Sequence, residues 1–122
     1  MASVLIIDDD DAVRGLLRAA LERAGHRVAE GRDGAEGMSL YRRAPADLVI
    51  TDVFMPGQDG IETIQQLREE FPQSRILAIS GGTMTGATGP LTDAKLLGAD
   101  ATLAKPFTID RLADAVRELL GG

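Results

Sequence analysis

Polar side chains that can handle a phosphate or a divalent cation follow four short apolar runs of this 122-residue chain. They are the acids Asp8, Asp9, Asp10 and Asp11 after LII at 5–7, Asp52 after LVIT at 48–51, Ser80 after ILAI at 76–79, and Lys105 after ATLA at 101–104. If these runs are parallel neighbouring strands, the polar groups meet at the carboxyl edge of one sheet, where ligands bind in open α/β folds. Carboxylates, a hydroxyl and an ammonium together indicate phosphoryl chemistry around a metal ion.

Each residue type suits one part of that chemistry. A carboxylate such as Asp52 can attack phosphorus without a base and form an acyl phosphate. Mg²⁺ takes one or two carboxylates together with phosphate oxygens and water. We therefore expect Asp9 and Asp52 to bind the ion directly and Asp8 to act through water. Lys105 offers a compact positive charge, and Ser80 a short hydroxyl donor, for phosphate oxygens.

The same residues also have purely structural interpretations. Asp52 could be a turn residue, Ser80 could cap a loop, and Lys105 could be an exposed lysine ahead of a proline. One or two of the acids at 8–11 need only start a helix, because Asp favours the first helical turn. A glycine-rich stretch at 81–89 (GGTMTGATG) lacks the GxxxxGK[ST] pattern of a nucleotide-binding loop.

Five strand candidates alternate with five helix candidates. The strands are expected at Ser3–Ile7, Arg27–Glu30, Asp47–Thr51, Arg75–Ile79 and Ala101–Ala104. Near-continuous apolar runs are typical of parallel strands buried on both faces. The alternation predicts an α/β, flavodoxin-like (βα)5 fold: a doubly wound, parallel five-stranded sheet of order 2-1-3-4-5.

Apolar periodicity and capping residues locate the helices. The apolar positions 13, 16, 17, 20 and 21 form a helical stripe, and Gly25 is a plausible stop. Further helices are expected at Gly34–Arg43, at about 60–70 and, after a late start at Pro90, at 90–97. The last helix should begin after Thr108 as N-cap and bury the apolar residues Ile109, Leu112, Ala113, Val116 and Leu119.

Composition excludes several functional classes. The net charge of −6 argues against direct nucleic-acid binding, which needs a basic surface. The chain has no cysteine and one histidine, His26, so thiolate and histidine metal sites are not expected. His26 should lie on the surface at the opposite edge of the sheet. No apolar run is long enough to span a membrane, and no signal peptide is recognisable, so the expected location is the cytoplasm.

Four motifs in order resemble one protein family over nearly the whole chain. IIDDD at 6–10, TDVFMPGQDG at 51–60, AIS at 78–80 and GADATLAKPF at 98–107 are similar to motifs of the receiver domain of bacterial two-component response regulators. Each motif alone is a weak signal, but their order and their positions at four strand ends are specific.

The resemblance implies a role for each matching residue. Asp52 would be phosphorylated, and Asp8 and Asp9 would bind Mg²⁺ together with Asp52 and the backbone carbonyl of Phe54. Ser80 would be the switch hydroxyl and Lys105 the phosphate-contacting lysine, with backbone amides of Phe54 and Gly81 completing the phosphate cradle. The resemblance also implies a cis peptide bond between Lys105 and Pro106.

Two features depart from the family pattern. Thr102 stands where many members carry an aromatic residue three positions before the lysine, so an aromatic rotamer switch at this position is excluded. The stretch between Ser80 and Lys105 is longer than the family leads us to expect, and it contains the Gly/Thr-rich segment 81–89. Both departures fall on the face of the fourth helix, fifth strand and fifth helix, through which relatives signal.

These observations predict a receiver domain at 1–120, with 121–122 starting a linker or ending the expressed segment, and no effector domain in the chain. It would take a phosphoryl group from a histidine kinase or a histidine phosphotransfer protein and signal to a downstream effector or a second copy, without binding membranes. It would not be an enzyme, although it would assist its own phosphorylation and dephosphorylation. Two alternatives are a phosphorylation-independent interaction module of receiver fold and a phosphatase with Asp8 as nucleophile, since Asp8-Asp9-Asp10 also fits a DxD pattern.

Overall fold

Strands and helices alternate along the chain in a computed structural model, which describes residues 2–53, 60–80, 98–104 and 107–121. The elements are β1 (Ser3–Ile7), α1 (Asp11–Arg23), β2 (Arg27–Gly31), α2 (Gly34–Arg43), β3 (Leu48–Asp52), α3 (Gly60–Glu70), β4 (Ile76–Ser80), β5 (Ala101–Ala104) and α5 (Ile109–Leu119). The helix expected at 90–97, the segment 81–89 and the Lys105–Pro106 bond lie outside the described residues.

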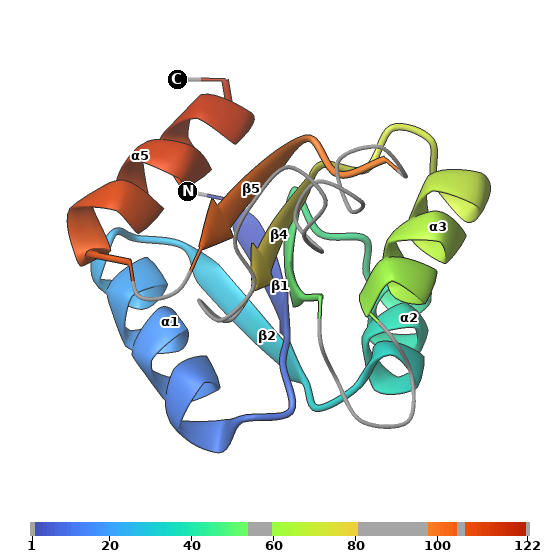
Figure 1. Ribbon diagram of the computed structural model, residues 1–122, viewed down its shortest axis with the longest axis horizontal. Helices are drawn as coiled ribbons and strands as arrows, with labels where there is room; N and C mark the ends of the chain where they lie inside the picture. Colours follow the sequence, from blue (N-terminus) through green and yellow to red (C-terminus); the bar gives the residue numbers. More distant parts are fainter. Residues whose placement is uncertain (1, 54–59, 81–97, 105–106, 122) are drawn as a thin grey trace.

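The five strands form one parallel sheet in the order β2-β1-β3-β4-β5. This is the flavodoxin-like order expected from the sequence, and Figure 1 shows the sheet at the centre of the molecule. The chain leaves β1 for β2 on one side and later returns to place β3 on the other. In open α/β sheets, ligands bind outside the carboxyl ends of the strands at such a reversal, which here lies between β1 and β3.

Helices cover both faces of the sheet. Figure 1 shows α1 and α5 on one side and α2 and α3 on the other. Alternate residues of β1, β3 and β4 therefore enter different cores: Leu5 and Ile7 of β1 pack on the α2–α3 side, and Val4 and Ile6 on the α1–α5 side. This double burial explains why these three central strands appear in the sequence as apolar runs. Within the described ranges, no helix is long and apolar enough to cross a membrane.

Short polar residues start the helices that follow β1, β2 and β5. Asp10 accepts from the backbone N–H groups of Ala12 and Val13, and Asp33 from that of Glu36. Thr108 accepts from the N–H of Arg111, as the sequence predicted. After α1, Gly25 adopts a positive φ of 93°, which explains the predicted stop, because residues with a Cβ rarely take this conformation.

The second helix packs unusually close to β1. A Cβ atom added at Gly37 of α2 would lie 2.6 Å from Cγ1 of Ile7 and closer still to its Cδ1. Ile7 is fully buried and β-branched, so it has little freedom to move aside. Glycine at position 37 therefore lets the helix approach the strand that leads to Asp8.

Several predicted limits and burials were wrong. β3 and β4 begin one residue later than predicted and end at Asp52 and Ser80, because both polar residues continue the ladder. β2 likewise extends to Gly31. Leu16 and Ile109 are 53% and 47% exposed, although both were expected in the buried stripes. Ala113 is exposed as well. Leu16 and Ala113 lie at the margins of the apolar stripes of α1 and α5, whereas Ile109 is the first residue of α5.

Candidate functional site

The two carboxylates that matter most come from neighbouring strands. Asp8 follows the last residue of β1, and Asp52 is the last residue of β3. These strands pair in parallel with Ile7 opposite Thr51, so the residues after that pair lie side by side at the carboxyl edge. The fold therefore brings together two acids that are 44 positions apart in the sequence, as predicted.

Asp8, Asp9 and Asp52 form an acidic cluster. Each offers a carboxylate oxygen, and these three oxygens lie within 4.8 Å of one another. Asp8 and Asp52 are buried, with 1% and 7% of their surface exposed, whereas Asp9 is exposed. Carboxylates this close repel one another unless a cation balances them. A set made only of carboxylate oxygens suits a hard divalent ion such as Mg²⁺.

Asp8 is held at three of its polar atoms. Its backbone N–H donates to the carbonyl of Gly31 at the end of β2, over 3.1 Å. Its Oδ1 accepts from the N–H of Asp10 at 2.9 Å. Its own carbonyl accepts from Nη1 of Arg14 at 2.7 Å. The position of this carboxylate is therefore fixed by β2, by the turn after β1 and by α1.

Arg14 is a residue of the site that the sequence motifs did not reveal. Its side chain is buried, and it also contacts the carboxylates of Asp11 and of Glu30, the latter at 3.1 Å from Nε. Burial opposes the charged form, but the hydrogen bonds to Asp11 and Glu30 outweigh it, so the pKa of Arg14 lies above its ordinary value. A signal was present: Arg14 is three and seven positions before the buried Leu17 and Leu21, and thus on the apolar face of α1.

Glu30 of β2 connects two arginines of α1. One oxygen accepts from Nε of Arg14, and the other accepts from Nη1 of Arg18 at 2.6 Å. The pKa of Glu30 lies below its ordinary value, chiefly because of the hydrogen bond from Arg18. Partial burial raises the pKa, and the hydrogen bond from Arg14 lowers it further. This carboxylate is therefore ionised at neutral pH and holds α1 against β2.

The other acids after β1 have structural roles. Asp10 caps α1, and Asp11 pairs with Arg14 in the first turn of the helix. This agrees with the expectation that one or two of the four acids only start a helix.

The structure describes only part of the predicted phosphate cradle. Ser80 is the last residue of β4, paired with Ala104 of β5, so its backbone lies at the same edge of the sheet as Asp52. Thr102 lies in β5 opposite Ala78 and is half-buried. Phe54, Gly81 and Lys105 lie outside the described residues.

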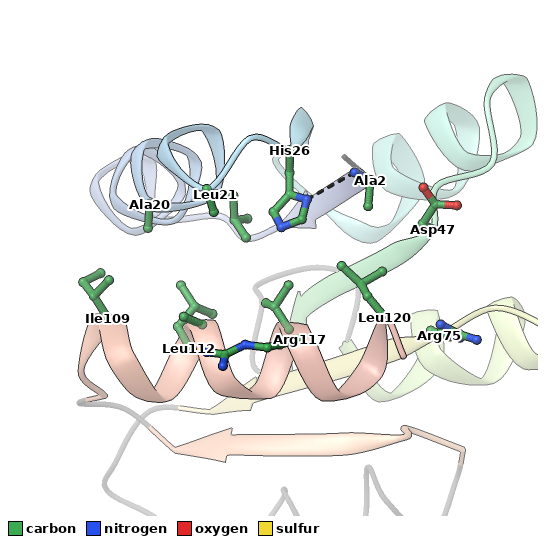
Figure 2. Close-up of a pocket in the computed structure, with 13 residues that line it drawn as sticks. Ala2, Ala20, Leu21, His26, Asp47, Arg75, Ile109, Leu112, Arg117 and Leu120 are labelled. Carbon is green, nitrogen blue, oxygen red and sulfur yellow. Dashed lines mark hydrogen bonds between the residues drawn. The ribbon is translucent and has the colours of Figure 1, made fainter. Parts of the chain in front are cut away.

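A groove of about 570 Å³ lies between α1 and α5, away from the acidic cluster. Figure 2 shows His26, Asp47 and Arg75 along it, with Ile109 and Leu112 from α5. The first three directly precede β2, β3 and β4, so the groove reaches the amino edge of the sheet, opposite the acids. His26 therefore has the predicted location, but it is half-buried, and its Nδ1 accepts from the N–H of Ala2 at 3.2 Å.

The comparison with known families matches this architecture. The model of the response regulator receiver domain matches residues 4–117 of the chain. The chain belongs to this family. Receiver domains are signalling modules of two-component systems rather than classical enzymes, and they generally bind Mg²⁺ at an acidic pocket.

Individual relatives show the same breadth of similarity. The chain is 31% identical to sporulation initiation phosphotransferase F of Bacillus subtilis, covering 96% of this chain and 92% of that protein. It is 37% identical to response regulator MprA of Mycobacterium sp. strain KMS, covering 96% of this chain but only 50% of MprA, so it spans half of that relative's length. The crystal structure of chemotaxis protein CheY4 from Vibrio cholerae superposes with a TM-score of 0.87 at 28% identity, covering 98% of both chains.

Proposed function

We propose that this receiver domain accepts a phosphoryl group on Asp52 in a magnesium-dependent reaction. The observation that carries the proposal is the acidic cluster of Asp8, Asp9 and Asp52 at the carboxyl ends of β1 and β3. The chain belongs to the receiver family, and its fold brings these carboxylates together although Asp8 and Asp52 are 44 positions apart in the sequence. Asp8, Asp9 and Asp52, with the backbone carbonyl of Phe54, would hold the ion, which supplies charge neutralisation at the phosphate oxygens when bound.

Transfer of the phosphoryl group to Asp52 needs no general base, because the attacking group is already a carboxylate. A carboxylate oxygen of Asp52 attacks phosphorus of a phosphohistidine, the new O–P bond forms and the P–N bond breaks. The electron pair stays on the departing imidazole nitrogen, which takes a proton from solvent. Because the transition state spreads charge over the equatorial oxygens, positioning and charge neutralisation provide most of the catalysis. Lys105, Ser80 and the amides of Phe54 and Gly81 would contact these oxygens.

The donor would be a histidine kinase or a histidine phosphotransfer protein. Response regulator receiver domains interact with such proteins, and some are joined to effector domains. Phosphorylation would shift a two-state equilibrium of the face that includes β5 and α5, by drawing Ser80 and Lys105 toward the new charge. Thr102, in place of an aromatic residue, would take part without an aromatic rotamer change.

Intact-mass analysis tests the proposal. The wild-type protein, incubated with Mg²⁺ and a small phosphodonor such as acetyl phosphate, should gain one labile phosphoryl group. The gain should disappear in Asp52→Asn and when the metal is removed with EDTA. A wild-type protein that gains no phosphoryl group in the presence of Mg²⁺ would contradict the proposal.

The same variants discriminate the alternatives. A phosphatase with Asp8 as nucleophile would hydrolyse a generic phosphate ester, and Asp8→Asn but not Asp52→Asn would abolish the turnover. We expect no such turnover. A phosphorylation-independent module would bind its partner equally well as wild type and as Asp52→Asn, with or without phosphodonor, whereas we expect the phosphodonor to change partner binding only in the wild type.

A further inference from the structure

A buried cation lies directly behind the acidic cluster. Arg14 is 8% exposed, although an arginine is seldom buried without a compensating partner. Burying an ion pair contributes little net stability, because the loss of hydration offsets the attraction between the charges. The stability of the fold therefore does not explain well why an arginine is buried at this position. The contacts of Arg14 with Asp8 indicate a role in the acidic cluster instead.

The guanidinium contacts the backbone of a cluster residue rather than its carboxylate. Nη1 of Arg14 donates to the carbonyl oxygen of Asp8 at 2.7 Å. The hydrogen bonds of Asp8 with Gly31 and with the N–H of Asp10 are made by main-chain groups of those residues, at the end of β2 and in the turn after β1. Arg14 thus supplies a side chain that holds the peptide between Asp8 and Asp9, and this peptide sets the direction of both carboxylates.

Arg14 is itself held from the opposite side. Its Nε donates to Glu30, whose other oxygen accepts from Arg18 one turn further along α1. Its remaining terminal nitrogen pairs with Asp11. A planar guanidinium that is fixed by two carboxylates has little freedom, so the nitrogen that faces Asp8 is held at a defined place.

We propose that Arg14 is a positioning residue for the metal site: by fixing the peptide carbonyl of Asp8, it orients Asp8 and Asp9 and raises the affinity of the cluster for Mg²⁺. The inference rests on the proposed magnesium site. Partners that orient metal ligands from outside the coordination shell change metal affinity by roughly 10–100-fold when they are removed.

The direction in which Mg²⁺ affinity changes when Arg14 is removed distinguishes a positioning role from a purely electrostatic one. A positive charge close to the cluster repels a divalent cation, so removing it should tighten Mg²⁺ binding if charge is its only influence. If Arg14 orients the carboxylates, its removal weakens binding although the repulsion is also removed. The two roles predict opposite changes of the same dissociation constant.

The test compares three variants by titration with Mg²⁺, following amide ¹H–¹⁵N shifts of Asp8–Asp10 at a temperature where each protein is folded. Arg14→Met removes both the contact and the charge. Arg14→Lys keeps the charge but lacks the fork that reaches Asp8 and Glu30 together. Arg18→Met is the matched control, because it removes one positive charge and one contact with Glu30 from the same helix but leaves the hydrogen bond between Arg14 and Asp8 in place.

We expect Arg14→Met to bind Mg²⁺ roughly tenfold or more weakly, Arg14→Lys to be weakened in the same direction, and Arg18→Met to bind as the wild type or more tightly. If Arg14→Met binds as well as or better than the wild type, the inference is overturned. If Arg14→Met does not fold, Arg14→Lys decides, and wild-type affinity in that variant overturns it. A wild-type protein that binds no Mg²⁺ would instead refute the proposed metal site itself.

Discussion

Arg68 should be one of the most important side chains for the stability of this fold. It lies near the end of α3 and donates to backbone carbonyls of three residues: Pro72 and Ser74 in the connection to β4, and Gly98 before β5. It also pairs with Asp100, whose Oδ2 accepts from the N–H of Ile76 at 2.8 Å. One guanidinium thus joins the amino ends of β4 and β5 to α3.

The structure gives the size of the expected loss for Arg68→Met. The bonds to Gly98 and Ser74 are partly buried, whereas those to Pro72 and Asp100 are exposed and will be replaced by water. A charged hydrogen bond contributes about 1.5–3 kcal/mol, and an exposed pair much less. After allowing for water at the two partly buried carbonyls, we expect the free energy of unfolding to fall by about 2–4 kcal/mol.

Urea unfolding followed by far-UV circular dichroism measures this loss, and it suits a chain without tryptophan. With an unfolding entropy of about 0.26 kcal/mol per kelvin for a domain of this size, the thermal midpoint should fall by about 8–15 °C. Arg42→Met is the matched control, because Arg42 makes two hydrogen bonds to Glu70 but lies on the surface. We expect no measurable change in that variant. Equal losses in both variants, or a loss below about 1 kcal/mol in Arg68→Met, would refute the reasoning.

Three further predictions concern packing, pH and capping. Gly37→Ala should lower the free energy of unfolding by about 1–3 kcal/mol, because its Cβ would overlap Ile7; an unchanged urea midpoint would contradict this packing. Glu30→Gln should be less stable than the wild type at neutral pH. Hydrogen bonds from arginines lower the pKa of Glu30 in the folded chain, so the difference should be complete above its ordinary value of 4.5 and should shrink as the pH falls below it. Urea unfolding of both proteins from about pH 3 to pH 7, a range that spans a carboxyl pKa, measures this difference. A difference in the free energy of unfolding that grows as the pH falls would contradict the prediction. Thr108→Ala should lose about 1 kcal/mol through the α5 cap, while Thr108→Ser should not; equal losses would exclude the cap.

The sheet and its order could be predicted from the sequence because the apolar runs are buried on both faces. A run such as LVI at 48–50, which is short and bounded by polar residues, is typical of a buried strand, and right-handed crossovers restrict the order of strands connected by helices. Strand ends were less predictable. Asp52 and Ser80 are polar, so the pattern ends before them, yet their backbones continue the parallel ladder. Hydrophobic patterns record side-chain burial and not backbone pairing.

The same limit applies to individual helix positions. Leu16 and Ile109 have apolar side chains at helical spacing, but both are about half exposed. Leu16 lies at the margin of the apolar stripe of α1, and Ile109 is the first residue of α5. Periodicity identifies the face of a helix but not how far the neighbouring element covers it.

The acidic cluster could be predicted from the sequence, but the contacts of Arg14 that hold Asp8 in place could not. Asp8 and Asp52 end strands that the predicted order makes neighbours, so their proximity follows from topology. Arg14 forms its contacts with Asp8 and Glu30 through three-dimensional packing of α1 on β2, and a charged residue on an apolar helix face was the sole sequence signal. Such supporting contacts depend on the exact approach of a helix to the sheet.

The central claim is that Asp52 is the phosphoacceptor, and chemical mapping of the modified residue tests it most directly. After incubation with Mg²⁺ and acetyl phosphate, borohydride reduces an acyl phosphate of aspartate to homoserine and releases phosphate, leaving a permanent mark at the modified position. Peptide mass spectrometry should then find homoserine at position 52, with Asp8 and Asp9 unchanged and with no conversion when EDTA is present. Conversion at Asp8 or Asp9, or no conversion at any aspartate, would contradict the claim.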